Sequence, residues 1–276
     1  MPLTVTTLVE NSPGEHKALA SEHGLCFHVD TGSATLLFDT GQSRAILDNA
    51  AKLRIDLSGL EHVVLSHNHY DHSGGLRTVA GAATGFTLTV GRGFFTPKYA
   101  ERGAALEYLG SDFDEAFLKA RGIRWSSLGE PVRRIAPGVH VLTDFPRTHP
   151  DEVVNPRFKV LADGRVQPDR FDDEILVALD SPRGLVVLLG CSHPGVKNML
   201  DAVRQRLGRP IHAVLGGTHL VEAAPGGLDA TLAYFREHDI RVVGVSHCTG
   251  NPAMERLRGL GERFFHNRTG SVLRME

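Results

Sequence analysis

Three histidines and an aspartate lie within six residues in the first quarter of the chain, at His67, His69, Asp71 and His72. Imidazole nitrogens and carboxylate oxygens are ligands that zinc and related divalent metals take in proteins. An apolar run at residues 63–65 precedes this motif and two glycines at 74–75 follow it, which predicts a loop at the end of a buried strand. A chance match to the pattern is well below about one per cent. We therefore interpret the motif as a metal-ligand cluster suited to hydrolytic chemistry.

Three later loops repeat this context. His193, His219 and His247 each follow an apolar strand and lie beside glycines. Loops at several strand ends commonly gather their side chains into one site, so we predict His193 and His247 as further metal ligands. For His219, the roles of metal ligand, proton donor and structural residue stay open. The remaining histidines have no companion ligands nearby in sequence and are interpreted as structural; they include His23, His28 and His140.

The elements that position these loops alternate along the chain. Strands are predicted over residues 4–10, 25–29, 35–39, 63–65 and 87–90, and then over 139–142, 175–179, 185–189, 211–215, 242–245 and 272–274. Apolar residues at helical spacing predict helices at 44–53, 113–121 and 196–207, near 228–238 and near 252–260. Two similar halves of this kind indicate an α/β fold in which two sheets pack together with helices outside. We predict a single domain over residues 1–276, with an insertion that covers the site at about 91–130.

Composition limits the classes of partner. The apolar fraction of 41% and the charged fraction of 22% are typical of a globular enzyme. A net charge of −2 gives no electrostatic footprint for nucleic acid. No stretch resembles a signal peptide or a membrane span, and three cysteines do not form a disulfide framework. We expect a cytoplasmic protein that binds a small molecule and neither nucleic acid nor a membrane; the sequence does not indicate an oligomeric state.

At the residues quoted above the chain resembles the metallo-β-lactamase-fold hydrolases, whose mark is H-x-H-x-D-H after a strand. Asp39, which precedes Thr-Gly, matches an upstream aspartate that supports this loop. Segments 8–11, 66–75, 190–193, 217–220 and 247–250 are similar to one subgroup, the dihydropterin-ribofuranosyl-aminobenzene-phosphate synthase-like proteins. The resemblance covers most of the chain. It implies an αββα sandwich of two mixed β-sheets flanked by helices, with a two-metal site at one edge.

The resemblance also implies a ligand set: His67, His69 and His193 for one metal, and Asp71, His72 and His247 for the other. The sequence departs from the family pattern at Cys191, which follows Gly190 where a bridging aspartate is expected. We favour His193 as the ligand that compensates. A contribution from Asp172 or Asp173, and a thiolate ligand at Cys191, are the alternatives. Zinc is the expected metal, manganese or iron would fit the same ligands, and occupancy by one metal instead of two stays open.

The predicted activity is hydrolysis of a small ester, phosphoester or lactone by a metal-activated water. In this prediction Asp71 binds metal and orients the water, and His219 protonates the leaving group. One alternative is the synthase activity of the subgroup, a condensation in which a phosphorylated aromatic amine displaces pyrophosphate from a pterin. The other is a non-catalytic, metal-stabilised binding module.

Overall fold

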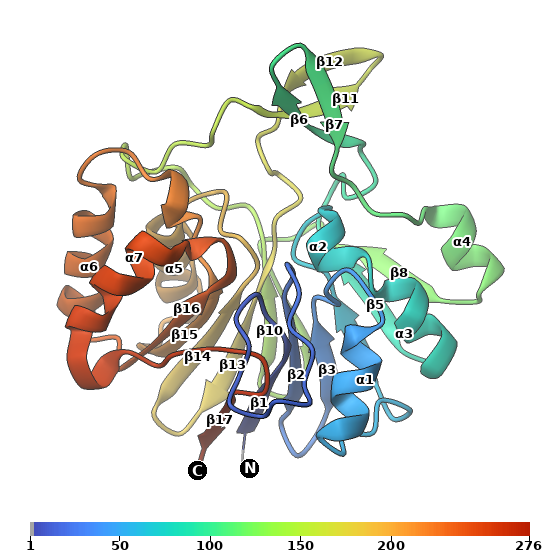
Figure 1. Cartoon of the computed structure of the whole chain (residues 1–276), viewed down its shortest axis with the longest axis horizontal. Helices are drawn as coiled ribbons and strands as arrows, with labels where there is room; N and C mark the ends of the chain where they lie inside the picture. Colours follow the sequence, from blue (N-terminus) through green and yellow to red (C-terminus); the bar gives the residue numbers. More distant parts are fainter. Residues whose placement is uncertain (1–2) are drawn as a thin grey trace.

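The computed structural model describes residues 3–276, whose strands form three sheets (Figure 1). The seven-stranded N-terminal sheet has the order β17 (Val272–Met275), β1 (Leu3–Val9), β2 (Cys26–Asp30), β3 (Thr35–Phe38), β4 (His62–Val64), β5 (Thr87–Val90) and β8 (Arg124–Ser127). The six-stranded C-terminal sheet has the order β16 (Val242–Ser246), β15 (Ile211–Gly217), β14 (Gly184–Leu189), β13 (Leu176–Ser181), β10 (Val139–Leu142) and β9 (Val132–Ala136). Both sheets contain parallel and antiparallel pairs.

The two large sheets pack face to face, because their strands are apolar on both sides. In β13 the side chains of Val177 and Leu179 pack between the sheets, while Leu176 and Ala178 pack under the outer helices. Successive side chains of a strand point to opposite faces, so a continuous apolar run is buried on both. Phe27 of β2 is one of the residues that the N-terminal sheet contributes to the core between the sheets.

Helices cover the outer face of each sheet. The N-terminal sheet is covered by α1 (Ala45–Lys52), α3 (Leu76–Ala82) and α4 (Glu115–Ala120), and the C-terminal sheet by α5 (Val196–Leu207), α6 (Gly227–Glu237) and α7 (Asn251–Leu257) (Figure 1). In α5, Val196, Met199, Leu200 and Val203 are buried at helical spacing. The layers are therefore helix, sheet, sheet and helix, which confirms the predicted αββα fold. Among residues 3–276, none of the helices has both the length and the apolar character needed to cross a bilayer.

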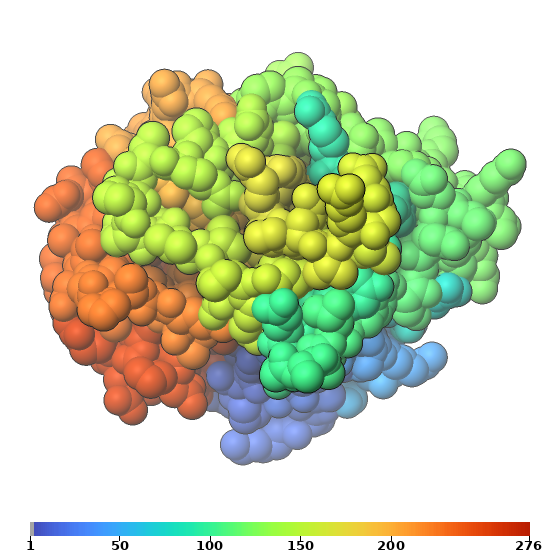
Figure 2. Space-filling model, turned by 90° about the horizontal axis from the view of Figure 1, so that it is seen from above, coloured from blue at the N-terminus to red at the C-terminus, as the bar shows by residue number. Residues whose placement is uncertain are grey.

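A smaller sheet lies above one edge of this sandwich. Its order is β12 (Arg165–Pro168), β11 (Phe158–Ala162), β6 (Lys98–Arg102) and β7 (Ala105–Tyr108), so it joins two hairpins that lie side by side on the top face (Figures 1 and 2). Only the first hairpin falls in the segment predicted as an insertion, 91–130. That segment also contains α4 and β8, and β8 belongs to the N-terminal sheet. The second hairpin has no counterpart among the predicted elements.

Candidate metal centre

The predicted ligands gather at one edge of the sandwich because of strand direction. β3, β4 and β5 are parallel neighbours in one sheet, and β14, β15 and β16 are parallel neighbours in the other. The carboxyl ends of parallel strands lie at the same edge of a sheet. His67 follows β4, and His193, His219 and His247 follow the three parallel strands of the C-terminal sheet. The short helix α2 (Tyr70–Ser73) carries the rest of the first motif to the same edge.

His67, His69 and His193 form the first group of candidate ligands, and all three side chains are buried. His67 Nε2 lies 3.0 Å from His69 Nδ1, and donor atoms of the three residues lie within 4.8 Å of one another. The Ser66 hydroxyl donates its hydrogen to Asp39 and lies 2.9 Å from His67 Nδ1. It therefore accepts the hydrogen of His67 Nδ1, which leaves Nε2 with a lone pair that faces His69 Nδ1.

Asp71, His72 and His247 form the second group. His247 Nε2 lies 3.1 Å from His72 Nε2 and 3.2 Å from Asp71 Oδ2. His72 Nδ1 lies 2.7 Å from Asp39 Oδ2, and His247 Nδ1 lies 2.8 Å from Asn11 Oδ1. Both oxygens only accept, so each ring in its neutral form carries its hydrogen on Nδ1 and presents an Nε2 lone pair to the group. Two lone pairs and a carboxylate oxygen therefore converge.

This donor set fits divalent cations. The Nε2 atoms of His69 and His193 are buried and lack a hydrogen-bond partner within residues 3–276, although an unpaired buried polar group is costly. Burial opposes a charge on His72, but Asp71 and Asp39 outweigh it and raise the pKa of His72 to about 9. The second group thus favours a positive charge at its centre. Imidazoles with one carboxylate suit zinc, and they also accept manganese or iron.

Two buried carboxylates that the sequence analysis missed hold the ligand loops from beneath. Glu10 accepts a hydrogen bond from the backbone N–H of His247 at 2.7 Å. Glu174 accepts from the backbone N–H groups of Ser192 at 2.6 Å and His193 at 3.0 Å. Burial and a neighbouring aspartate raise the pKa of Glu174 to about 8. Glu174 lies outside any local motif, and Glu10 lies in segment 8–11, which was noted only for its similarity to the subgroup.

The ligand loops contain several residues with left-handed backbone, which is uncommon for residues other than glycine. The φ angle is 62° at Asp39, 60° at Ser192, 51° at His219 and 56° at His247. Such conformations cost free energy and persist where the surrounding structure fixes them, often at functional sites. In this site the buried carboxylates and the ends of the strands hold the backbone of these loops in place.

The interpretation of His23 as a structural histidine without companion ligands is wrong. Its Nε2 lies 3.2 Å from Asp71 Oδ2, and its ring stacks on that of His247 with the centroids 5.1 Å apart. The side chain is 54% exposed. The partners of His23 are far from it in sequence, which is why neighbouring residues gave no indication of the contact.

The residues considered as substitutes for a bridging aspartate lie in different places. Asp172 is 74% exposed. Asp173 is buried, but its oxygens bind Lys98 Nζ at 2.8 Å and the backbone N–H of Asn68 at 3.0 Å. Of these three residues, Cys191 lies beside the candidate ligands, with its Sγ 3.2 Å from His72 Nε2.

His219 lies beside the first group and faces an acid. Its ring centroid is 4.4 Å from that of His193, and its Nδ1 is 3.4 Å from Glu222 Oε2. Glu222 Oε1 also binds Arg157 Nη2 at 2.8 Å. Burial is the main cause that lowers the pKa of His219 to about 4, so its ring is neutral at pH 7.

A cavity of about 210 Å³ opens over both groups. Asp71 and His219 line it, together with Arg102 of β6 and Arg157, which precedes β11. The Arg157 guanidinium lies 4.4 Å above the ring of Phe158. The smaller sheet and the residue that leads into it thus contribute two cationic side chains to the wall of this cavity.

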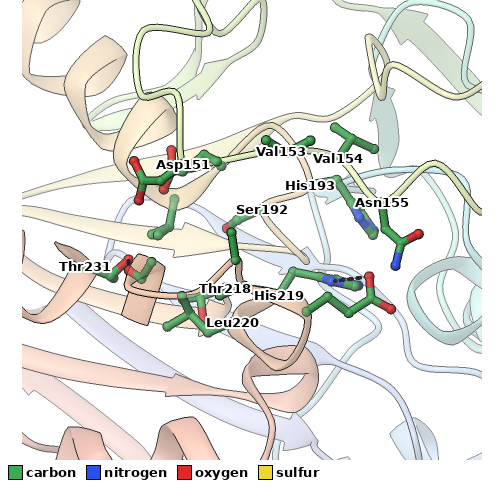
Figure 3. A pocket seen from close by; sticks show the side chains of 17 residues that line it. Asp151, Val153, Val154, Asn155, Ser192, His193, Thr218, His219, Leu220 and Thr231 are labelled. Carbon is green, nitrogen blue, oxygen red and sulfur yellow. Dashed lines mark hydrogen bonds and ion pairs between the residues drawn. The ribbon is translucent and has the colours of Figure 1, made fainter. Parts of the chain in front are cut away.

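A second cavity, of about 60 Å³, continues from the same residues. His193 and His219 lie at one end and Asp151 and Thr231 at the other (Figure 3). Its wall includes several small or apolar side chains: Val153, Val154, Val196, Leu220, Ala223 and Ala224. The two cavities meet at His193, His219 and Glu222.

Similarity to a known family accounts for this arrangement. Residues 22–195, which are more than half of the chain, match the family described as the metallo-beta-lactamase superfamily. The chain belongs to the metallo-beta-lactamase superfamily. Within this superfamily it is 29% identical to a Methanocaldococcus jannaschii protein named 7,8-dihydropterin-6-methyl-4-(beta-D-ribofuranosyl)-aminobenzene-5'-phosphate synthase, across 90% of this chain and 88% of the relative. The resemblance predicted from the sequence is confirmed.

Solved structures of the superfamily agree. The crystal structure of Tm1679, described as a metal-dependent hydrolase of the beta-lactamase superfamily, has a TM-score of 0.86 and 29% identity, with 98% of each chain covered. A diphosphatase from the PhnP family has a TM-score of 0.56 at 13% identity, with 100% of this chain and 98% of that chain covered, and shares the fold.

Proposed function

We propose that this superfamily member is a metal-dependent hydrolase that uses an activated water molecule to cleave a small ester, phosphoester or lactone. The observation that carries the proposal is the convergence of the two ligand groups, in which buried imidazole lone pairs and a carboxylate oxygen meet at one cavity. Structural histidines are normally paired with hydrogen-bond partners. The unpaired Nε2 of His193, judged within residues 3–276, departs from that norm.

The first group would hold one divalent cation and the second group another, with zinc as the expected metal and manganese or iron as alternatives. Bound there, such a cation lowers the pKa of a water molecule towards about 7 and polarises the attacked substrate oxygen. The chain itself fixes the ring orientations. Asp39 does so for His72, and Asn11 does so for His247.

Asp71 is the proposed group that orients the attacking water. Burial would raise the pKa of Asp71, but His72 and a hydrogen bond from His23 hold it well below its usual range. Asp71 is therefore ionised at pH 7 and accepts hydrogen bonds only. A carboxylate at the cavity wall can accept one hydrogen of the water and so direct a lone pair towards the substrate.

His219 is the proposed partner of the leaving group. With its pKa lowered to about 4, its ring is neutral at pH 7. It would act by donating its one N–H hydrogen bond to the leaving oxygen, which then takes its proton from solvent.

The cavity walls favour a substrate with an anionic group, and therefore a phosphoester within the proposed range. Arg157 and Arg102 line the cavity over the ligand groups, where they pair with Glu222 and Glu107. A guanidinium has five N–H donors, so those left over can bind phosphate or carboxylate oxygens. The adjoining cavity of about 60 Å³ would take a small, largely apolar substituent.

The test is turnover by zinc- or manganese-loaded protein of three model substrates: bis(p-nitrophenyl) phosphate, p-nitrophenyl acetate and a simple lactone. We expect hydrolysis of at least one of them, abolished by a chelator and by H67A. H149A is the matched control, because His149 pairs with Asp201 at 2.8 Å outside the two groups. Metal-loaded protein that turns over none of the three classes would contradict the hydrolase proposal.

A second candidate function is supported by the relative named a synthase, which this chain matches over 90% of its length. We propose as the alternative that the same site promotes condensation of a pterin pyrophosphate with a phosphorylated aromatic amine, with pyrophosphate leaving. The arginine-lined cavity suits the anionic groups of both reactants. Formation of the coupled product, followed by mass spectrometry, together with absent hydrolysis of the model substrates, would favour this alternative.

A further inference from the structure

Cys191 lies where the two ligand groups meet. Its side chain is 3% exposed. Its Sγ lies 3.2 Å from His72 Nε2 and within 4.8 Å of donor atoms of both His67 and His72. His67 belongs to the first group and His72 to the second, so one sulfur atom is close to both groups.

The loop reaches this position because the preceding residue is a glycine. A Cβ atom at Gly190 would lie 2.2 Å from Ser66 Oγ and 3.3 Å from His67 Nδ1. Any larger residue would push the end of β14 away from the first motif. The Gly190–Cys191 pair therefore brings the sulfur atom to the histidines.

A neutral thiol at Cys191 gains little stabilisation from its contact with His72. His72 Nδ1 is bound to Asp39, so the neutral His72 ring presents an Nε2 lone pair to the sulfur. A thiol donates only a weak hydrogen bond to such a lone pair. A thiolate, by contrast, is one of the preferred ligands of zinc.

The neighbouring Cys248 differs from Cys191 in its surroundings. It follows β16, is half-buried and donates to the backbone carbonyl of Cys191, with Sγ 3.6 Å from that oxygen. Its Sγ approaches donor atoms of Cys191 and His219, and His219 is outside both ligand groups. The geometry therefore distinguishes Cys191 as the sulfur between the groups.

We propose that Cys191 binds metal as a thiolate shared between the two ligand groups, in the place where the superfamily pattern predicts a bridging aspartate. The proposal rests on the metal centre of the proposed function. As the metal–sulfur bond forms, the thiol proton passes to solvent. A thiolate is a soft ligand that selects zinc over manganese, so Cys191 narrows the range of metals that the histidines alone would accept.

The experiment is Co²⁺ substitution, because cobalt bound to a thiolate gives a sulfur-to-cobalt charge-transfer band in the near ultraviolet that imidazole and carboxylate ligands do not give. We expect the band in the wild type and in C248S, and its loss in C191S. The weaker visible bands of bound cobalt should persist in C191S. C26S is the matched control, since Cys26 is equally buried but lies on β2 in the core under α1.

Each outcome decides between the proposals. A band that persists in C191S, or that is lost in C248S, overturns the role of Cys191. Bound cobalt without the band in the wild type also overturns it, while the histidine centre and the hydrolase proposal stand. Protein that binds no cobalt at all overturns both proposals.

X-ray absorption of the zinc-loaded wild type gives a test that does not depend on the folding of C191S. A sulfur scatterer at about 2.3 Å from zinc is expected, and it should remain in C248S. A zinc shell of nitrogen and oxygen alone overturns the proposal.

Discussion

Replacing Lys98 with methionine tests how a buried ion group supports the ligand loop. Lys98 Nζ lies 2.6 Å from Asp169 Oδ2 and 2.8 Å from Asp173 Oδ1, and these side chains are only 2–4% exposed. The other oxygen of Asp173 accepts the backbone N–H of Asn68, inside the first motif. Methionine preserves most of the volume but removes the charge and the donors, so both carboxylates lose their partner.

The expected cost follows from burial. Removing one partner of a buried ion pair costs about 3–5 kcal/mol. Burial raises the pKa of Asp173 despite Lys98, so this carboxyl can take up a proton in K98M. A neutral Asp173 no longer needs a cation, and the loss of stability therefore stays within that range although two acids are affected. At about 2–4 °C per kcal/mol for chains of roughly this size, the midpoint of thermal unfolding should fall by about 6–20 °C.

The assay is urea denaturation at pH 7, followed by circular dichroism, for the wild type, K98M and the control K159M. Lys159 Nζ lies 3.2 Å from Glu101 on the surface of the smaller sheet, where such a pair contributes about 0–1 kcal/mol. The double variant K98M–D169N should recover part of the stability, because only one buried acid is then left without its cation. If K98M loses no more stability than K159M, the buried ion group does not support the structure as reasoned.

Three further predictions concern the residues around the ligands and one buried histidine. F171L removes the ring that stacks on His193 with the centroids 3.7 Å apart; we expect zinc affinity to fall about tenfold in a chelator competition, and unchanged affinity would show that the stacking does not orient His193. D39N weakens the hold on Ser66 and His72 and should reduce zinc affinity by about 10–100-fold, whereas D48N, at an exposed helix pair, should leave it unchanged. Burial lowers the pKa of His28 below 6.5, so the unfolded chain binds this proton more readily than the folded chain does. The stability of the fold therefore decreases as the pH falls below about 6.5. The melting temperature of H28Q should fall less than that of the wild type between pH 7.5 and 5.5, and an equal fall would contradict this assignment.

The sandwich and the first motif could be predicted because their signals are local. Strands such as β14 are buried on both faces and are therefore continuous apolar runs. Such a run predicts a strand even when the strands that pair with it are not known. The ligands proposed from the first motif lie within six residues, and His193 and His247 repeat its strand-to-loop context. The order of the elements then sufficed to place these loops at one edge.

The smaller sheet and the two supporting acids, Glu10 and Glu174, could not be predicted, because the contacts that determine them join residues far apart in sequence. β7 and β12 are exposed along their whole length, so they carry no apolar alternation. Glu10 is separated from His247 by 237 positions, and Glu174 differs from its acidic neighbours only in which backbone groups it meets. Such contacts depend on the tertiary packing of segments that are remote in sequence.

The left-handed residues of the ligand loops set a condition for engineering. Glycine adopts this backbone without the penalty that His219 and His247 bear. A selection for heat resistance carried out without metal would therefore reward glycine at these positions and discard the imidazoles. If the proposed metal centre is correct, stabilised variants of this protein should be selected with the metal present, so that metal binding offsets the conformational cost of keeping histidine.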